Sequence, residues 1–161
     1  ALGPRAVAPM LKVLIESESR QIRRALIDRL IRIPDHVRPH LAPLVNDERW
    51  YVQRNVLFLA AELPGMPLAV DAAPFRQHPD QRVRREALRV LFRHTEERTR
   101  AICTALSDED PRVKRQALNA VVEGGVPEPA VSLLIALASD SDQETELRVG
   151  AMRALAPAET S

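Results

Sequence analysis

Asp108-Glu-Asp-Pro-Arg-Val-Lys-Arg-Gln-Ala-Leu118 and His78-Pro-Asp-Gln-Arg-Val-Arg-Arg-Glu-Ala-Leu88 are the two stretches that decide the fold of this chain. In both, an acidic turn leads into a basic segment, and apolar residues follow at fixed intervals from a valine, Val113 or Val83. Apolar residues at intervals of zero, four, five and eight share one face of an α-helix. The two stretches therefore predict two copies of one amphipathic helix.

The same pattern occurs five times along the 161 residues, each copy marked by an apolar anchor residue. Successive anchors lie 30, 31, 30 and 34 residues apart, a period that indicates stacked helical repeats. An earlier helix is expected in each repeat, because Ile15, Val45 and Leu106 lie seven positions before their anchors. Arg76 is the exception at this position in repeat three, where Phe75 beside it takes over. The anchors are Ile22, Val52, Val83, Val113 and Leu147.

These intervals predict an all-α fold of about five antiparallel helical hairpins, stacked as a right-handed superhelix or solenoid. The expected repeats cover residues 1–33, 34–64, 65–94, 95–125 and 126–157 of one domain, and 158–161 form a tail. Leu2-Gly3 resembles the end of a preceding helix, so we expect the chain to be part of a longer one.

Turn residues predict where individual helices start and end. Asp47, Asp80 and Asp110 each precede an anchor and are expected to cap the second helix of a repeat. Pro43 and Pro74 are expected to delay or kink the first helices of repeats two and three. In repeat three Asp71 could cap a short helix, and in repeat five residues 139–145 lengthen the inner turn.

Composition excludes several classes of protein. Lys and Arg number 23 against 22 Asp and Glu, so the net charge of +1 gives no global attraction to nucleic acid or anionic lipid. The single cysteine, Cys103, allows no internal disulfide and fits a reducing compartment. No apolar run approaches the roughly 20 residues that span a bilayer. We expect a cytoplasmic protein without a membrane partner.

The two opening stretches resemble the second-helix signature of HEAT repeats, an armadillo-like family. Arg5-Ala-Val-Ala-Pro-Met-Leu11 is also similar to the first helix of the short bacterial version of this repeat. The resemblance extends over nearly the whole chain, but such arrays serve many activities, so it identifies the repeat type and not the function. A helical wheel places the residue after each anchor inside the apolar arc, so we interpret this column as structural; its members are Arg23, Gln53, Arg84, Lys114 and Arg148. The resemblance implies that a basic residue in this column meets an acidic turn.

In arrays of this kind the second helices line the concave side, where residues two and six positions after each anchor point away from the core. We interpret this column as a basic, non-catalytic protein-binding surface with one aromatic side chain, Phe58, that takes an acidic segment of a protein partner. An ordinary solvated helix face, with Glu62, Glu86 and Glu123 pairing nearby arginines, is an equal alternative. The candidate partner-binding residues are Arg24, Arg54, Phe58, Arg85, Arg89, Arg115 and Arg153.

Two enzymatic alternatives come from the resemblance. Some HEAT-like arrays are DNA glycosylases, for which Trp50, Tyr51 and Arg54 would be the suspects here, and others attach bilin chromophores. Few aromatic residues and no paired carboxylates disfavour the glycosylase, and nucleic-acid binding over the whole chain is disfavoured by the balanced charge. His36 and His40 lack a surrounding zinc motif, so we expect no metal and no cofactor.

Overall fold

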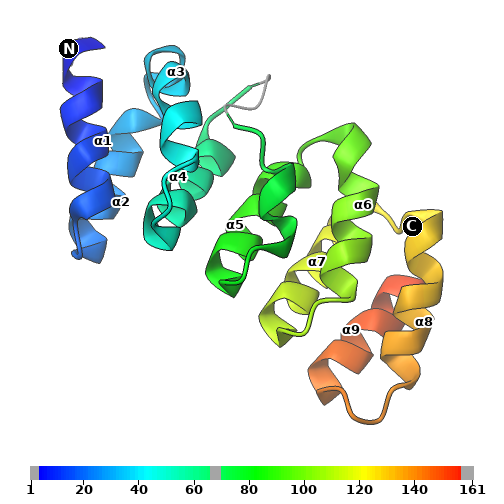
Figure 1. The fold of residues 1–161 in the computed structure, drawn as a ribbon. Helices are drawn as coiled ribbons and strands as arrows, with labels where there is room; N and C mark the ends of the chain where they lie inside the picture. The colour runs from blue at the N-terminus through cyan, green and yellow to red at the C-terminus, as the bar shows by residue number, and fades with distance from the viewer. Residues whose placement is uncertain (1–3, 66–69, 157–161) are drawn as a thin grey trace. The chain divides into compact units, whose positions relative to one another are not determined.

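The computed structural model describes residues 4–65 and 70–156, and every regular element in these two ranges is a helix (Figure 1). The predicted all-α fold of helical hairpins is confirmed, whereas the right hand of the superhelix stays a prediction. The expected helix end at Leu2-Gly3 and the tail 158–161 lie outside the described residues. The chain divides into two compact units, residues 1–90 and 91–161.

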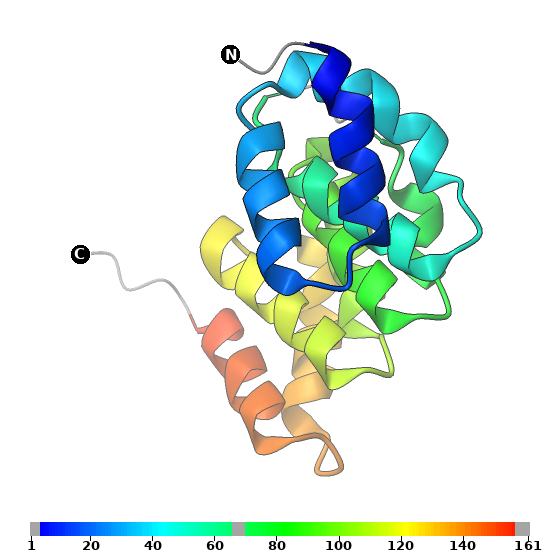
Figure 2. The ribbon, with the colours of Figure 1, turned by 90° about the vertical axis from the view of Figure 1, so that its left-hand side faces the viewer.

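The first unit contains two full hairpins and one shortened one. A 3₁₀ turn, η1 (Pro4–Ala6), leads into α1 (Val7–Glu16), and α1 pairs with α2 (Arg20–Leu30). The second hairpin is α3 (Pro34–Val45) with α4 (Trp50–Glu62). Figures 1 and 2 show both pairs as antiparallel neighbours. In the third repeat a 3₁₀ turn, η2 (Ala73–Gln77), stands before α5 (Gln81–Leu91).

The second unit contains two hairpins. They are α6 (Thr95–Leu106) with α7 (Pro111–Gly124), and α8 (Val131–Ser139) with α9 (Thr145–Leu155), joined by the 3₁₀ turn η3 (Glu128–Ala130). The inner turn of the last hairpin spans residues 140–144, the longest of the described inner turns, as the sequence predicted. At the end of α7, Gly125 has a φ of 79°, a conformation that glycine adopts without strain.

The anchor residues mark equivalent positions, because each is the third residue of its α-helix. Val52, Val83, Val113 and Leu147 are all buried, with at most 1% of their surface exposed. Ile22 was predicted to be buried as well, but 47% of its surface is exposed. The difference arises because α4 packs against α1 of the preceding hairpin, and among the described residues α2 has no such hairpin before it.

The prolines affect repeats two and three differently. The predicted late start of the first helix in repeat two is wrong, because α3 begins at Pro34 and continues through Pro39 and Pro43. Both internal prolines are exposed, so water can satisfy the carbonyl groups that lose a helical donor. In repeat three the helix is reduced to η2, and Asp71 accepts a hydrogen bond from the Ala73 N–H (3.0 Å), as the sequence suggested.

Two of the three predicted helix caps are confirmed. Asp110 and Asp80 accept hydrogen bonds of 2.8 Å from the backbone N–H of the second helical residue in α7 and α5. Asp47 does not cap α4, because that helix begins three residues later, at Trp50. Its carboxylate instead accepts from the backbone N–H of Arg49 at 2.9 Å and pairs with the Arg49 guanidinium at 2.7 Å.

The basic residues that follow the anchors hold the inner turns. Arg23 donates to the carbonyl of Ser17 (2.8 Å), and Arg84 donates to the carbonyl of His78 (2.9 Å), six residues upstream in both cases. Lys114 donates to the side-chain oxygen of Gln143 in the next repeat (2.7 Å). The prediction of a carboxylate partner is wrong for Arg23 and Lys114. Arg23 donates to a backbone carbonyl, and Lys114 donates to an amide oxygen.

Candidate functional site

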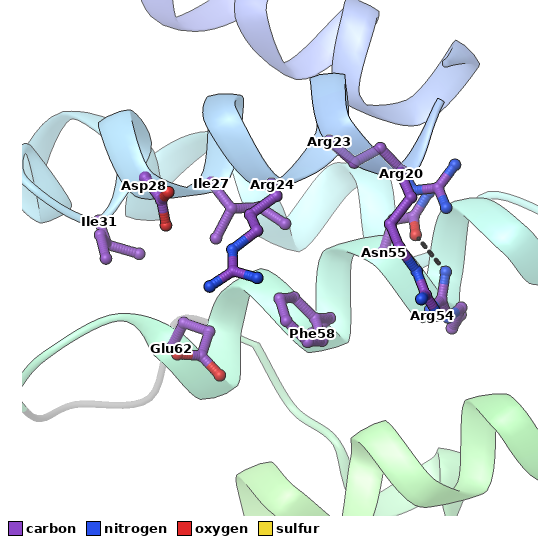
Figure 3. A pocket seen from close by; sticks show the side chains of 10 residues that line it. All are labelled: Arg20, Arg23, Arg24, Ile27, Asp28, Ile31, Arg54, Asn55, Phe58 and Glu62. Carbon is purple, nitrogen blue, oxygen red and sulfur yellow. Dashed lines mark hydrogen bonds between the residues drawn. The ribbon is translucent and has the colours of Figure 1, made fainter. Parts of the chain in front are cut away.

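A hollow of about 480 Å³ lies between α2 and α4 in the first unit, and we call it the arginine groove (Figure 3). Its basic residues come from the first half of each helix, and its apolar residues follow further along. Three polar side chains complete the lining. The arginine groove consists of Arg20, Arg23, Arg24, Arg54, Ile27, Ile31, Phe58, Asp28, Asn55 and Glu62.

Helical spacing explains why these side chains share one surface. Arg20, Arg24 and Asp28 are successive residues at four-residue intervals on α2, as are Arg54 and Phe58 on α4. Residues four apart lie on the same helix face. The buried residues Leu30 on α2 and Val52 on α4 lie on the opposite side of these helices, in the core, so the four-residue rows face outward.

The four guanidiniums of the groove are not neutralised by carboxylates. Within residues 4–65 and 70–156, none of Arg20, Arg23, Arg24 and Arg54 forms an ion pair. Arg54 donates to Asn55 Oδ1 at 3.0 Å, a neutral acceptor whose residue is itself buried. Four guanidiniums without an ion pair around one hollow favour the approach of an anionic group.

The environment of Arg54 is unfavourable for its own charge. Partial burial is the main cause that lowers the pKa of the Arg54 guanidinium below its ordinary value. The Glu86 carboxylate acts in the opposite direction, but the guanidiniums of Arg23, Arg82 and Arg20 lower the pKa further. An anion placed beside Arg54 would relieve both the repulsion and the lost solvation.

Helix dipoles add to this positive potential. Arg20 is the first residue of α2, and neither α2 nor α4 has an acidic residue in its first turn. The N-terminus of a helix carries a partial positive charge, so acidic residues there are stabilising and basic residues are not. The arginines therefore lie where they reduce the stability of α2 and strengthen attraction for an anion.

A second hollow, of about 640 Å³, adjoins the arginine groove and shares Arg23, Arg54 and Asn55 with it. Trp50 and Tyr51 line it, with their rings in an edge-to-face arrangement. The Arg82 guanidinium lies 3.7 Å from the centre of the Trp50 ring and pairs with Asp80. The contact between Arg82 and Trp50 thus joins α4 to α5 of the next repeat.

Three of the seven predicted residues, Arg24, Arg54 and Phe58, line the arginine groove together. Arg89 lies beside it but is neutralised, because it pairs with Glu86 at 3.0 Å and with Glu62. Its guanidinium also covers Phe58, 4.9 Å from the ring centre. For Arg89 the solvated-face alternative describes the contacts better than the basic-surface prediction.

The other predicted residues are not part of the groove. Arg85 is half-buried on α5 and does not line it. Arg115 and Arg153 belong to the second unit, where both line a hollow between α7 and α9. Arg115 pairs with Glu144 and Glu146 at 3.1 Å each, so its charge is compensated.

Sequence reasoning missed three features of the groove. Arg20 lies one helical turn before Arg24 on the same face, and extending the column by four residues would have found it. Arg23 was assigned only to the turn, yet it lines both hollows while donating to Ser17. The apolar wall of Ile27 and Ile31 carried no separate signal, because isoleucine on a repeat helix ordinarily indicates core.

Neither the histidines of α3 nor Cys103 belongs to a metal-binding cluster among the described residues. His36 and His40 are exposed on α3, and no cluster of three or more His, Cys, Asp or Glu suited to a metal occurs within the described ranges. Burial raises the pKa of the Cys103 thiol, which disfavours the reactive thiolate. Among the described residues no helix combines the length and apolar character that crossing a membrane requires.

Comparison with known families gives one match. The sequence model for HEAT repeats matches residues 72–156, which is more than half of the chain and includes both signature stretches. The chain belongs to the HEAT-repeat family. HEAT repeats generally act as non-catalytic scaffolds and commonly bind proteins. The arginine groove of this HEAT-repeat chain lies before the matched range, in residues 20–62. No curated protein matches the chain.

Proposed function

We propose that this HEAT-repeat chain is a cytoplasmic, non-catalytic binding module whose arginine groove takes an acidic segment of a protein partner. The observation that carries the proposal is the set of four guanidiniums without an ion pair among the described residues, gathered around one hollow. Phe58 and Ile27 in the same hollow offer apolar contact beside the charges. Aromatic and arginine side chains in one pocket are typical of residues that dominate binding energy.

A protein partner fits the charge distribution better than a nucleic acid. Residues 1–90 contain 15 Lys and Arg against 10 Asp and Glu, a net charge of +5. Residues 91–161 contain 8 against 12, a net charge of −4. A polyanion that contacts both units would be repelled by the second, whereas a short acidic segment needs only the first.

The test uses a fluorescein-labelled peptide, Gly-Glu-Glu-Leu-Leu-Glu-Glu-Gly, and fluorescence anisotropy at about 0.15 M salt. Replacing Arg20→Glu together with Arg24→Glu should weaken binding by about tenfold, since two attractions become repulsions. Both side chains are exposed, and acidic residues suit the start of α2, so the melting temperature should not fall.

A matched control separates the groove from the general charge of the unit. Arg29→Glu with Arg32→Glu makes the same charge change on exposed residues of the first unit that do not line the groove. This variant should keep most of the affinity. Equal losses in both variants, or tighter capture of a DNA duplex than of the peptide by the unaltered protein, would reject the proposed function.

A further inference from the structure

The arginine groove has opposite charges at its two ends. Figure 3 shows the side chains of Arg20, Arg23 and Arg54 together at one end, with Asp28 and Glu62 toward the other. Phe58 lies between them on α4. Since all of these residues come from α2 and α4, one pair of helices sets the whole order of charges.

Each helix places an acidic residue eight positions after an arginine. On α2 the pair is Arg20 and Asp28, and on α4 it is Arg54 and Glu62. Eight residues correspond to about 12 Å at ~1.5 Å per residue, so the basic and acidic ends are separated by about that distance. An extended peptide covers the same distance with about four residues.

The acidic end has a charge available for a partner. Asp28 is exposed and forms no ion pair within the described part of the chain. Glu62 pairs with Arg89, but Arg89 also pairs with Glu86, so two carboxylates share one guanidinium. At this end the Asp28 and Glu62 carboxylates line the groove, and the Arg24 guanidinium points toward them (Figure 3). Asp28, exposed and without an ion pair among the described residues, is the carboxylate that a cationic group of a partner can approach.

We infer that the arginine groove selects its partner by charge order, taking an acidic group over Arg20 and Arg54, an apolar side chain at Phe58, and a basic group beside Asp28. This inference rests on the proposed function and narrows it, because a segment that is acidic throughout would meet like charge at Asp28. The partner is therefore a protein segment with acidic, apolar and basic residues in sequence. Like charges placed opposite each other suppress wrong partners.

The experiment compares two peptides of one composition. In the block peptide, Gly-Glu-Glu-Leu-Leu-Lys-Lys-Gly, the charges are separated in the proposed order. In the mixed peptide, Gly-Glu-Lys-Leu-Leu-Glu-Lys-Gly, both ends carry both charges. By anisotropy the block peptide should bind about fivefold more tightly, although the net charges are equal.

The substitution Asp28→Lys should change the affinities for the block peptide and for the wholly acidic peptide in opposite directions. The block peptide should bind about threefold more weakly, and the wholly acidic peptide used above about threefold more tightly. Glu48→Lys is the control, since it makes the same charge change at an exposed position outside the groove. It should leave the ratio of the affinities for the two peptides unchanged.

The results distinguish failure of the charge-order inference from failure of the proposed function. Equal binding of block and mixed peptides, with loss of both on Arg20→Glu and Arg24→Glu, would overturn charge order and leave the proposed function standing. Charge order would also be overturned, and the proposed function left standing, if Asp28→Lys changed the affinity for every peptide by the same factor. If none of the three peptides binds, the proposed function fails, and the charge-order inference fails with it.

Discussion

The role of each arginine in this chain depends on which oxygen lies within its reach. Arg23 and Arg84 hold inner turns through backbone carbonyls. Arg89 and Arg115 are neutralised by carboxylates, and Arg24 forms no ion pair among the described residues. Arginine offers five donors in a fixed plane, so one residue type serves all three roles. Only the arginines without a carboxylate can attract a partner strongly.

The pair of Asp47 and Arg49 gives a prediction for pH. The side-chain hydrogen bond from Arg49, with a further one from its backbone N–H, lowers the pKa of the Asp47 carboxyl from 3.8 to about 2. A pKa lowered by folding means that the pair stabilises the fold above pH ~4 and that this contribution disappears as pH falls through about 2. Arg49→Gln should raise the pKa of Asp47 but leave it below 3.8, since the backbone bond remains.

Carbon-detected NMR of the carboxyl groups, titrated from about pH 6 to about pH 2, measures this pKa directly. Arg82→Gln is the matched variant, because Arg82 lowers the pKa of Asp80 in the same way. It should raise the pKa of Asp80 and leave that of Asp47 unchanged. A normal pKa for Asp47 in the unaltered protein would contradict the ion pair.

At the scale of elements, the apolar period predicted the second helix of every repeat and its outward face. Val52, Val83 and Val113 hold equivalent positions in three of these second helices, and all three are buried. First helices were less predictable. The period alone did not reveal that α3 would continue through Pro43 while the equivalent segment of repeat three would shrink to η2.

The arginine groove was only partly predictable for a related reason. Helical spacing located Arg24, Arg54 and Phe58, since an outward position follows from the periodicity within one helix. Whether an arginine is neutralised depends on side chains from other helices. Arg89 meets Glu62 from the preceding repeat, 27 residues earlier, and no local pattern encodes that meeting.

The start of α7 gives a prediction about a single helix. Asp110 caps this helix by accepting from the Arg112 N–H at 2.8 Å, and Pro111 occupies the first helical position. Asp110→Ala should lower the free energy of unfolding by about 1 kcal/mol, the usual effect of losing a cap. Asp110→Asn keeps the capping oxygen and should cost only a fraction of that amount. Urea unfolding followed by circular dichroism measures both, and equal losses would show that charge, not capping, is responsible.

At the scale of the whole molecule, the two units differ in sign of charge, +5 for residues 1–90 and −4 for residues 91–161. The first unit also exposes Ile22 and carries arginines at the start of α2, where they oppose the helix dipole. Positions that weaken a fold and strengthen a binding surface are expected where function is favoured over stability. The net charge of +1 for the whole chain conceals this division.

Self-repulsion in the first unit should make its stability depend on salt. Raising NaCl from about 20 mM to about 200 mM shortens the Debye length from about 20 Å to about 7 Å, and this screens the uncompensated guanidiniums. Amide hydrogen exchange in α2 and α4 should therefore slow severalfold, because local opening becomes less favourable. The variant with Arg20→Glu and Arg24→Glu reduces the net charge of the unit from +5 to +1, so it should lose most of this response. Faster exchange at the higher salt concentration in the unaltered protein would mean that its ion pairs, such as Asp47 with Arg49, outweigh repulsion among the arginines of the groove.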